Sequence, residues 1–283
     1  MKFFLLAIIF LTSFLKNFAF GEIPQSNKII GIFILSLFLS NSCFAKDYLF
    51  SNNIYTDCDI ITKKDASYFQ NLSFIEEKEI LFWDRRAVTS SGWNKSKFKA
   101  FIFNAKFRNG EDVIVRVNSE FKTKEKAEKK AIKYSKMAGQ IPNFLKTSLK
   151  TITIHKGNKP WGGGNFDILI HTGDEGGKGK CGEEVMLHES GHVSLDETWG
   201  GLIPLNVWKK VAKLDGKYIS KYAKDFPDRE DISETINWWV AVRCKQDRIS
   251  KSNYKKILKA IPNRLKYLDE QNFDTSPLAC NYN

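Results

Sequence analysis

Residues 183–196 of the chain read Glu-Glu-Val-Met-Leu-His-Glu-Ser-Gly-His-Val-Ser-Leu-Asp. We expect a helix here, because apolar residues recur along the segment and acidic residues in a first turn suit the helix dipole. His188 and His192 are four residues apart, so a helix places both imidazoles on one face. Such a pair can offer two ligands to one zinc ion, and Glu189 beside them can take a proton from zinc-bound water. Gly191 lowers the helix propensity by roughly 1 kcal/mol against Ala, which suggests that another backbone approaches closely there.

A zinc site of this kind needs a third protein ligand and one open position for water. The best candidates lie in residues 228–239, where acidic residues stand in a run that ends in apolar ones, so that their carboxylates need a partner. We expect Glu234 to be the third ligand, because it lies deepest in this predicted helix beside the apolar residues. Glu230 and Asp231 are the alternatives, and an acid that does not bind the metal would orient an imidazole from behind.

Other interpretations remain open for the groups around this site. Arg229 or Arg243 could neutralise the acids in place of a metal ion. Asp196, one turn after His192, could accept a hydrogen bond from that histidine or simply end the helix. Tyr222 precedes the acidic helix, and its hydroxyl could stabilise the oxyanion of a tetrahedral intermediate, with ordinary packing as the alternative.

Strand and turn patterns precede the histidine helix. Residues 99–107 and 112–117 are rich in β-formers and flank Asn109-Gly110, which predicts a hairpin. The other predicted elements are an extended segment over residues 47–61, a helix over 123–138, strands over 151–155 and 166–171, and a helix over 252–268.

The strand over residues 166–171 leads toward the histidine helix. We expect it to be the sheet edge that pairs with an extended substrate. The glycine-rich loop over residues 161–164 would then form one wall of a cleft. His155 and His171 are expected to be strand histidines with local partners rather than metal ligands.

The composition is that of a globular protein, with 42% hydrophobic residues, and the formal net charge is +12. Lysines are densest in one predicted helix, where they suggest a solvated face or an attraction to an anionic surface such as the cell envelope. No nucleic-acid-binding motif accompanies them. The lysines of this cluster are Lys122, Lys124, Lys126, Lys129, Lys130, Lys133 and Lys136.

Residues 1–45 contain two basic-then-apolar units, each too short for a comfortable membrane span, and end in small residues. We expect a signal segment cleaved after Ala45, with a retained membrane anchor as the alternative. Residues 46–283 would form one domain, in which a hairpin-plus-helix portion over 46–150 precedes a catalytic portion over 151–283.

Four cysteines follow the expected signal segment, and an even number in an exported protein suggests two disulfides. We favour Cys244–Cys280, which would tie the tail to a helix, and therefore Cys58–Cys181. Zinc ligation by cysteine is disfavoured, because the sequence has no Cys-x-x-Cys pair.

The set of His188, Glu189, His192 and Glu234 resembles the zincins and, within them, the gluzincins typified by the thermolysin family. Glu234 follows His192 by 42 residues, and Trp238 stands where the thermolysin-like pattern has an Asp, so the chain is more similar to gluzincin-type domains outside that family. The resemblance implies an α+β fold, with a small twisted sheet beside the active-site helix and a helical C-terminal half.

We therefore expect an exported zinc metalloendopeptidase, secreted or held in the periplasm or envelope, that hydrolyses peptide bonds. Zn²⁺ would be held by His188, His192 and Glu234, with Glu189 as general base and Tyr222 as an oxyanion donor. The partner would be a protein or peptide substrate rather than a specific nucleic acid, and the chain would be a monomer. The alternatives are an inactive zinc-binding envelope protein and a basic polyanion-binding surface protein in which the motif is accidental.

Overall fold

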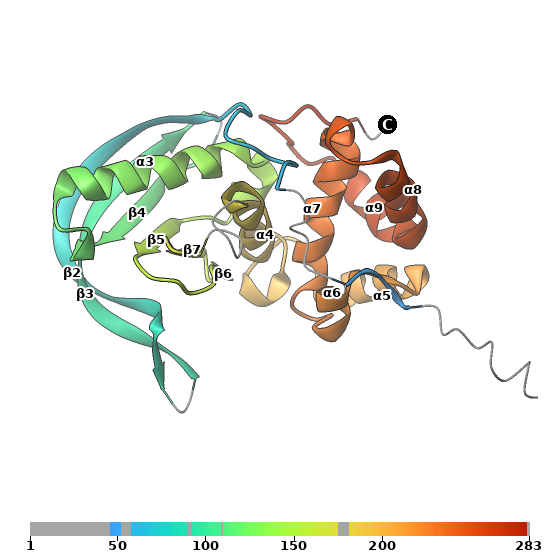
Figure 1. The fold of residues 1–283 in the computed structure, drawn as a ribbon, viewed down its shortest axis with the longest axis horizontal. Coiled ribbons are helices and arrows are strands. Elements are labelled where there is room, and N and C mark those ends of the chain that lie inside the picture. The colour runs from blue at the N-terminus through green and yellow to red at the C-terminus, as the bar shows by residue number, and fades with distance from the viewer. Residues whose placement is uncertain (1–45, 52–57, 90–91, 109, 175–180, 282–283) are drawn as a thin grey trace, which may run out of the picture. The chain divides into compact units, whose positions relative to one another are not determined.

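The computed structural model describes residues 46–51, 58–89, 92–108, 110–174 and 181–281. The expected signal segment lies outside these residues. Residues 47–283 form one compact unit, in which a sheet with helices on it is followed by a helical half (Figure 1). Among the described helices, none is both long and apolar enough to span a bilayer.

The main sheet has the strand order β2-β3-β4-β5-β7-β6. Antiparallel pairs join β2 to β3, β3 to β4 and β7 to β6, whereas β4, β5 and β7 run parallel. The predicted hairpin around residue 110 is confirmed as the β3–β4 pair. The strands are β2 (Phe69–Thr89), β3 (Gly92–Phe107), β4 (Val113–Asn118), β5 (Thr151–His155), β6 (Gly162–Gly164) and β7 (Asp167–His171).

The expected edge strand is an inner strand. Every residue of β7 is buried, and β7 pairs with β5 on one side and with β6 on the other. Its nearly continuous apolar core is typical of a strand covered on both faces. The true edge is β6, three consecutive glycines that we had expected to form a loop.

Strand β2 was not predicted, because its many Glu, Lys and Arg residues give no clear apolar alternation. It pairs with β3 in a long antiparallel ribbon (Figure 1). Lys99 pairs with Glu77 across the ribbon, and such cross-strand charge pairs favour this register.

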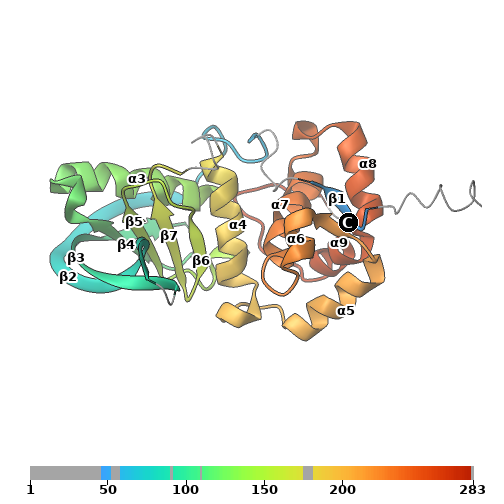
Figure 2. The ribbon, with the colours of Figure 1, turned by 60° about the horizontal axis from the view of Figure 1, so that its bottom comes forward.

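Helix α4 (Gly182–Ser194) stands between the sheet and the helical half (Figure 2), and all its residues are buried. Helix α3 (Lys124–Gln140), capped by Thr123, confirms the predicted lysine-rich helix. The helical half contains α5 (Leu205–Asp215), α6 (Lys221–Asp225), α7 (Asp231–Cys244), α8 (Lys251–Ala260) and α9 (Pro262–Asp269). The expected single C-terminal helix is thus two, because Pro262 starts a new helix where it lacks the N–H to continue the old one. Short 3₁₀ turns are η1 (Ser119–Phe121), η2 (Asn143–Lys146), η3 (Glu197–Trp199) and η4 (Gln246–Arg248).

The segment before the ribbon is fastened to the helical half. Strand β1 (Tyr48–Phe50) pairs in parallel with β8 (Tyr218–Ser220), in keeping with its predicted extended form. The Ile60 amide donates to Glu184 Oε1 in α4 at 2.8 Å. Asp65 accepts hydrogen bonds from Lys245 and Arg248, each at 2.6 Å. Residues from the two ends of the described chain therefore share one core.

Both predicted disulfides are present in the structure. Cys58–Cys181 joins the first segment to the N-terminus of α4, and Cys244–Cys280 joins the last residue of α7 to the C-terminal tail. Paired cysteines of this kind indicate an extracellular or otherwise oxidising compartment.

A buried ion cluster holds the start of α7. The Arg264 side chain is fully buried and donates from Nε to Asp231 Oδ2 and from Nη1 to Asp215 Oδ2, both at 2.9 Å. Trp208 Nε1 also donates to Asp231 Oδ2, at 2.8 Å. Asp231 is therefore a structural ion-pair partner, and its cation is Arg264 rather than Arg229 or Arg243.

We expect Arg264→Met to lower the free energy of unfolding by about 3–5 kcal/mol, because it leaves buried carboxylates without a cation. Lys266→Met is the control, since this side chain lies in the same helix and is 75% exposed. Urea unfolding followed by circular dichroism gives both values, and equal midpoints for the two variants would contradict this account of the cluster.

The end of the ribbon covers two buried histidines on the sheet. His155 and His171 are in register on β5 and β7, so they share one face. His155 Nε2 lies 3.2 Å from the Trp83 carbonyl, to which it donates, and Asn118 Nδ2 donates to its Nδ1 at 3.0 Å. Burial lowers the pKa of His155 to about 4, although the nearby Asp84 carboxylate opposes the shift. Both histidines thus have local partners, as expected.

This neutral histidine makes folding sensitive to acid. Between pH of about 6.5 and about 4 the unfolded chain binds a proton that folded His155 does not, so the contribution of His155 to stability falls as the pH falls through this window, by up to about 3 kcal/mol. Burial also lowers the pKa of His171, which adds in the same direction, whereas burial raises the pKa of Asp167 and of Asp231 to about 6, and their contributions to stability rise as the pH falls. We expect the unfolding free energy of the parent protein, measured relative to that of His155→Gln, to fall as the pH falls from 6.5 to 4. A difference that stays constant over this range would show that His155 takes up its proton at the same pH in the folded and unfolded protein.

Candidate metal centre

Helices α4 and α7 approach each other closely at Gly191. A Cβ on this residue would lie 3.0 Å from Ser233 Oγ and 3.2 Å from an Ile236 methyl, tighter than ordinary packing. Asn237 Nδ2 donates to the Glu184 carbonyl at 3.1 Å, and this hydrogen bond fixes the position of α7 along the axis of α4. The close backbone approach suggested by the glycine is therefore present, and it brings the start of α7 beside the two histidines.

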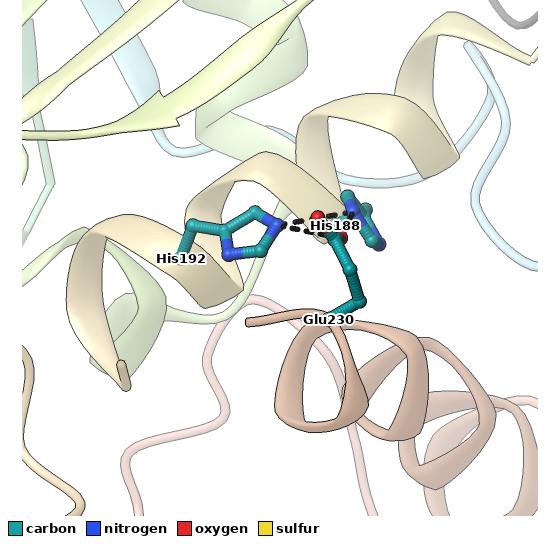
Figure 3. A group of neighbouring side chains, drawn as sticks. All are labelled: His188, His192 and Glu230. Atoms are coloured by element: carbon teal, nitrogen blue, oxygen red, sulfur yellow. Dashed lines mark hydrogen bonds and ion pairs between the residues drawn. The ribbon is translucent and has the colours of Figure 1, made fainter. Parts of the chain in front are cut away.

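Three side-chain atoms converge at this crossing (Figure 3). The Nε2 atoms of His188 and His192 are 3.2 Å apart, and Glu230 Oε2 lies 3.2 Å from the second and 3.4 Å from the first. Zinc bonds of about 2.0–2.1 Å in a tetrahedron place neighbouring ligand atoms about 3.3 Å apart. The three observed separations match three edges of such a tetrahedron, so this buried group could hold a metal ion.

The third member of the group is Glu230 rather than Glu234, which we had ranked first. Glu230 is the residue just before α7, and its side chain reaches both imidazoles. Glu234, one turn further into the helix, reaches only the other side of His188, where its Oε1 lies 3.7 Å from Nδ1. The geometry therefore favours Glu230 as the third ligand, and its position at the helix start was the signal that we undervalued.

Carboxylates stand behind both imidazoles. Glu234 faces Nδ1 of His188, and its Oε2 accepts a hydrogen bond from Ser220 Oγ at 2.7 Å. Asp196 Oδ2 lies 3.8 Å from Nδ1 of His192, while its Oδ1 accepts from the Thr198 amide and caps η3. Asp196 therefore lies within ion-pair distance of His192 and caps η3, whereas α4 itself ends at Ser194 with Leu195 as its C-cap. Carboxylates in this position are typical of histidines whose other nitrogen binds a metal, because they fix the orientation of the ring.

The electrostatics of the group depend on its burial and on its internal pairs. Burial alone would raise the pKa of Glu230, but hydrogen bonds with His188 and His192 hold it far below its usual value. Burial opposes a charge on His192, yet Asp196 and Glu230 raise its pKa to about 10. Burial raises the pKa of Glu234. The group therefore combines a favoured negative charge on Glu230 with a favoured positive charge on His192.

Glu189 and Tyr222 complete the site. Glu189 follows His188 in α4 and interacts electrostatically with His192 and Tyr222. Burial and the charge of Glu230 raise the pKa of Tyr222 to about 12. The phenol therefore remains protonated at neutral pH and can donate a hydrogen bond. Arg85, from the ribbon, interacts electrostatically with Glu189, Tyr222 and Glu230, and nothing in the sequence pattern had singled it out.

No protein-family model matches the chain, and it matches no curated protein and no solved structure.

Substitutions of Glu230, just before α7, and of Glu234, within it, should cause different losses of metal affinity. We expect Glu230→Gln to weaken zinc binding by more than about 100-fold, because it removes a charged ligand, and Glu234→Gln by about 10–100-fold, because it disturbs a group behind the ligand. Competition with a fluorescent chelator measures both, with Glu270→Gln as an exposed control. If Glu234→Gln weakened binding more than Glu230→Gln, the assignment of the two residues would be reversed.

Proposed function

We propose that this chain is a zinc-dependent metalloendopeptidase of the zincin type, exported from the cell, with His188, His192 and Glu230 as metal ligands. The observation that carries the proposal is the set of three ligand-atom separations, together with Glu189 in the next position of the same helix. Nitrogen and oxygen ligands at tetrahedral spacing suit zinc, and an acid beside them suits hydrolysis.

The arrangement of the elements also supports a peptidase. Helix α4 lies between a sheet and a helical half, and edge strand β6 packs against it. The contact is so close that a Cβ added to Gly163 would collide with the Glu189 carbonyl oxygen. An extended peptide added to the free edge of β6 would place its backbone beside Glu189. The edge-strand role that we expected for residues 166–171 thus passes to Gly162–Gly164.

The side chains divide the reaction between them. A bound zinc ion would lower the pKa of a coordinated water molecule and polarise the scissile carbonyl. Glu189 accepts the proton of the attacking water and delivers it to the leaving amine. Tyr222, held protonated, donates a hydrogen bond to the oxygen that becomes negative in the transition state. Glu234 and Asp196 hold the two imidazoles in place from behind.

The test is hydrolysis of an unfolded protein, such as casein, by the purified zinc-loaded chain. We expect a chelator to abolish cleavage and zinc to restore it. Glu189→Gln should keep its zinc but lose at least about 100-fold in kcat/KM, the range typical of a lost general base. Glu270→Gln should behave as the parent protein.

Activity that survives Glu189→Gln with zinc still bound would contradict the mechanism. Bound zinc without hydrolysis of any unfolded substrate would favour an inactive zinc-binding protein instead.

A further inference from the structure

The pairing of β2 with β3 is irregular at three places, and the largest irregularity, three residues long, lies close to the tip of the ribbon. Asp84 pairs with Asn94 and Val88 pairs with Trp93, so residues 85–87 of β2 have no counterpart in β3. A bulge of this kind re-aims the side chains that it carries, and bulges are common beside active sites. The extra residues include two consecutive arginines, Arg85 and Arg86.

Arg86 anchors the bulge to the sheet. Its guanidinium donates to Asp84 Oδ2 and to Glu120 Oε2, both at 2.7 Å. Its side chain also lies against Gly157, next to the loop that follows β5. These contacts hold the backbone of the bulge in place, so the position of Arg85 is set by a rigid support.

Arg85 points instead to the edge strand. A Cβ on Gly162 would collide with the Arg85 guanidinium, whereas a Cβ on Gly163, the next residue, would collide with the Glu189 carbonyl on the other side. Strand β6 therefore lies between Arg85 and the catalytic helix. Its lack of side chains lets the guanidinium come close, and Arg85 interacts electrostatically with Glu189, Tyr222 and Glu230.

A peptide on the free edge of β6 would present its side chains alternately to α4 and to the ribbon. The Arg85 guanidinium lies against Gly162 on the ribbon side, one residue from Gly163, where β6 touches Glu189, about 3.3 Å along the strand. The planar guanidinium of Arg85 can donate two parallel hydrogen bonds to one carboxylate. Because the side chain is partly buried, water and salt screen such an ion pair less than on the surface. Arg229, a second cation near this group, has a side chain that is 63% exposed and donates to Glu230 at 3.2 Å.

We propose that Arg85 binds a carboxylate of the substrate, so that the centre selects peptides with an acidic side chain or a free C-terminus next to the scissile bond. The inference rests on the proposed function for the reaction, but the anion-binding role of Arg85 can be measured without turnover.

The first experiment uses two thiols of equal length as probes of the zinc-loaded full chain, 3-mercaptopropionate and its amide. The thiol group of each binds the metal, and only one of them carries a carboxylate. Calorimetry should show that the parent protein prefers the acid by about 10-fold or more, the range expected for a charge-assisted pair. Arg85→Met should bring the ratio close to one, and Arg85→Lys, without the planar guanidinium, should leave an intermediate ratio.

Lys97→Met is the matched control, because Lys97 is an exposed cation of the same ribbon whose partner is Glu79. It should keep the preference of the parent protein. The zinc content and unfolding midpoint of each variant show whether the centre is intact. A ratio that Arg85→Met leaves unchanged, or a parent protein without any preference, would overturn the proposal.

The second experiment separates the two sources of the carboxylate. Otherwise identical peptides carry Asp or Asn at each internal position and end in a free acid or an amide. We expect one of these changes to lower kcat/KM in the parent protein and to have no effect in Arg85→Met. Equal cleavage of all peptides by the parent protein would reject the role of Arg85 and leave the peptidase standing. A thiol preference that depends on Arg85, without cleavage of any peptide, would support the anion-binding role of Arg85 and reject the peptidase activity.

Discussion

The close contact between α4 and α7 is the constraint on which the candidate metal centre depends. Gly191 has no side chain, so Ser233 and Ile236 lie against the backbone of α4. Glu230 and Glu234 are four residues apart, which is about 6 Å along a helix axis. The lengthwise position of α7 therefore decides which carboxylate reaches the imidazoles. The hydrogen bond of Asn237 to α4 holds the position that selects Glu230.

The parts of the site that a local pattern encodes could be predicted. The spacing of His188 and His192 is a property of one helix, and the turn around Gly110 is a property of a few residues. The third ligand could be narrowed to one acidic helix but not chosen within it. That choice depends on how two helices dock, and Asp231 in the same run is taken up by Arg264, a partner far along the chain.

Other features have causes that no local pattern contains. Three consecutive glycines have low strand propensity, yet they form an edge strand because β7 supplies their hydrogen bonds and α4 leaves no room for a Cβ at Gly163. The sequence of strand β2 is largely polar, because most of the ribbon lies near the surface, and it therefore lacks the apolar pattern that would predict a strand. Arg85 reaches the site from about 100 residues upstream, through a bulge that becomes visible only in the pairing of two strands.

The pairing of β1 with β8 has a consequence for the order in which the chain is built. A strand at Tyr48–Phe50 finds its partner only at Tyr218–Ser220, and Asp65 finds its cations only after α7. The backbone groups of β1 obtain their hydrogen-bond partners only when the last third of the polypeptide has been synthesised. The candidate metal group is completed late as well, because His188 and His192 meet Glu230 only after the start of α7 has been synthesised.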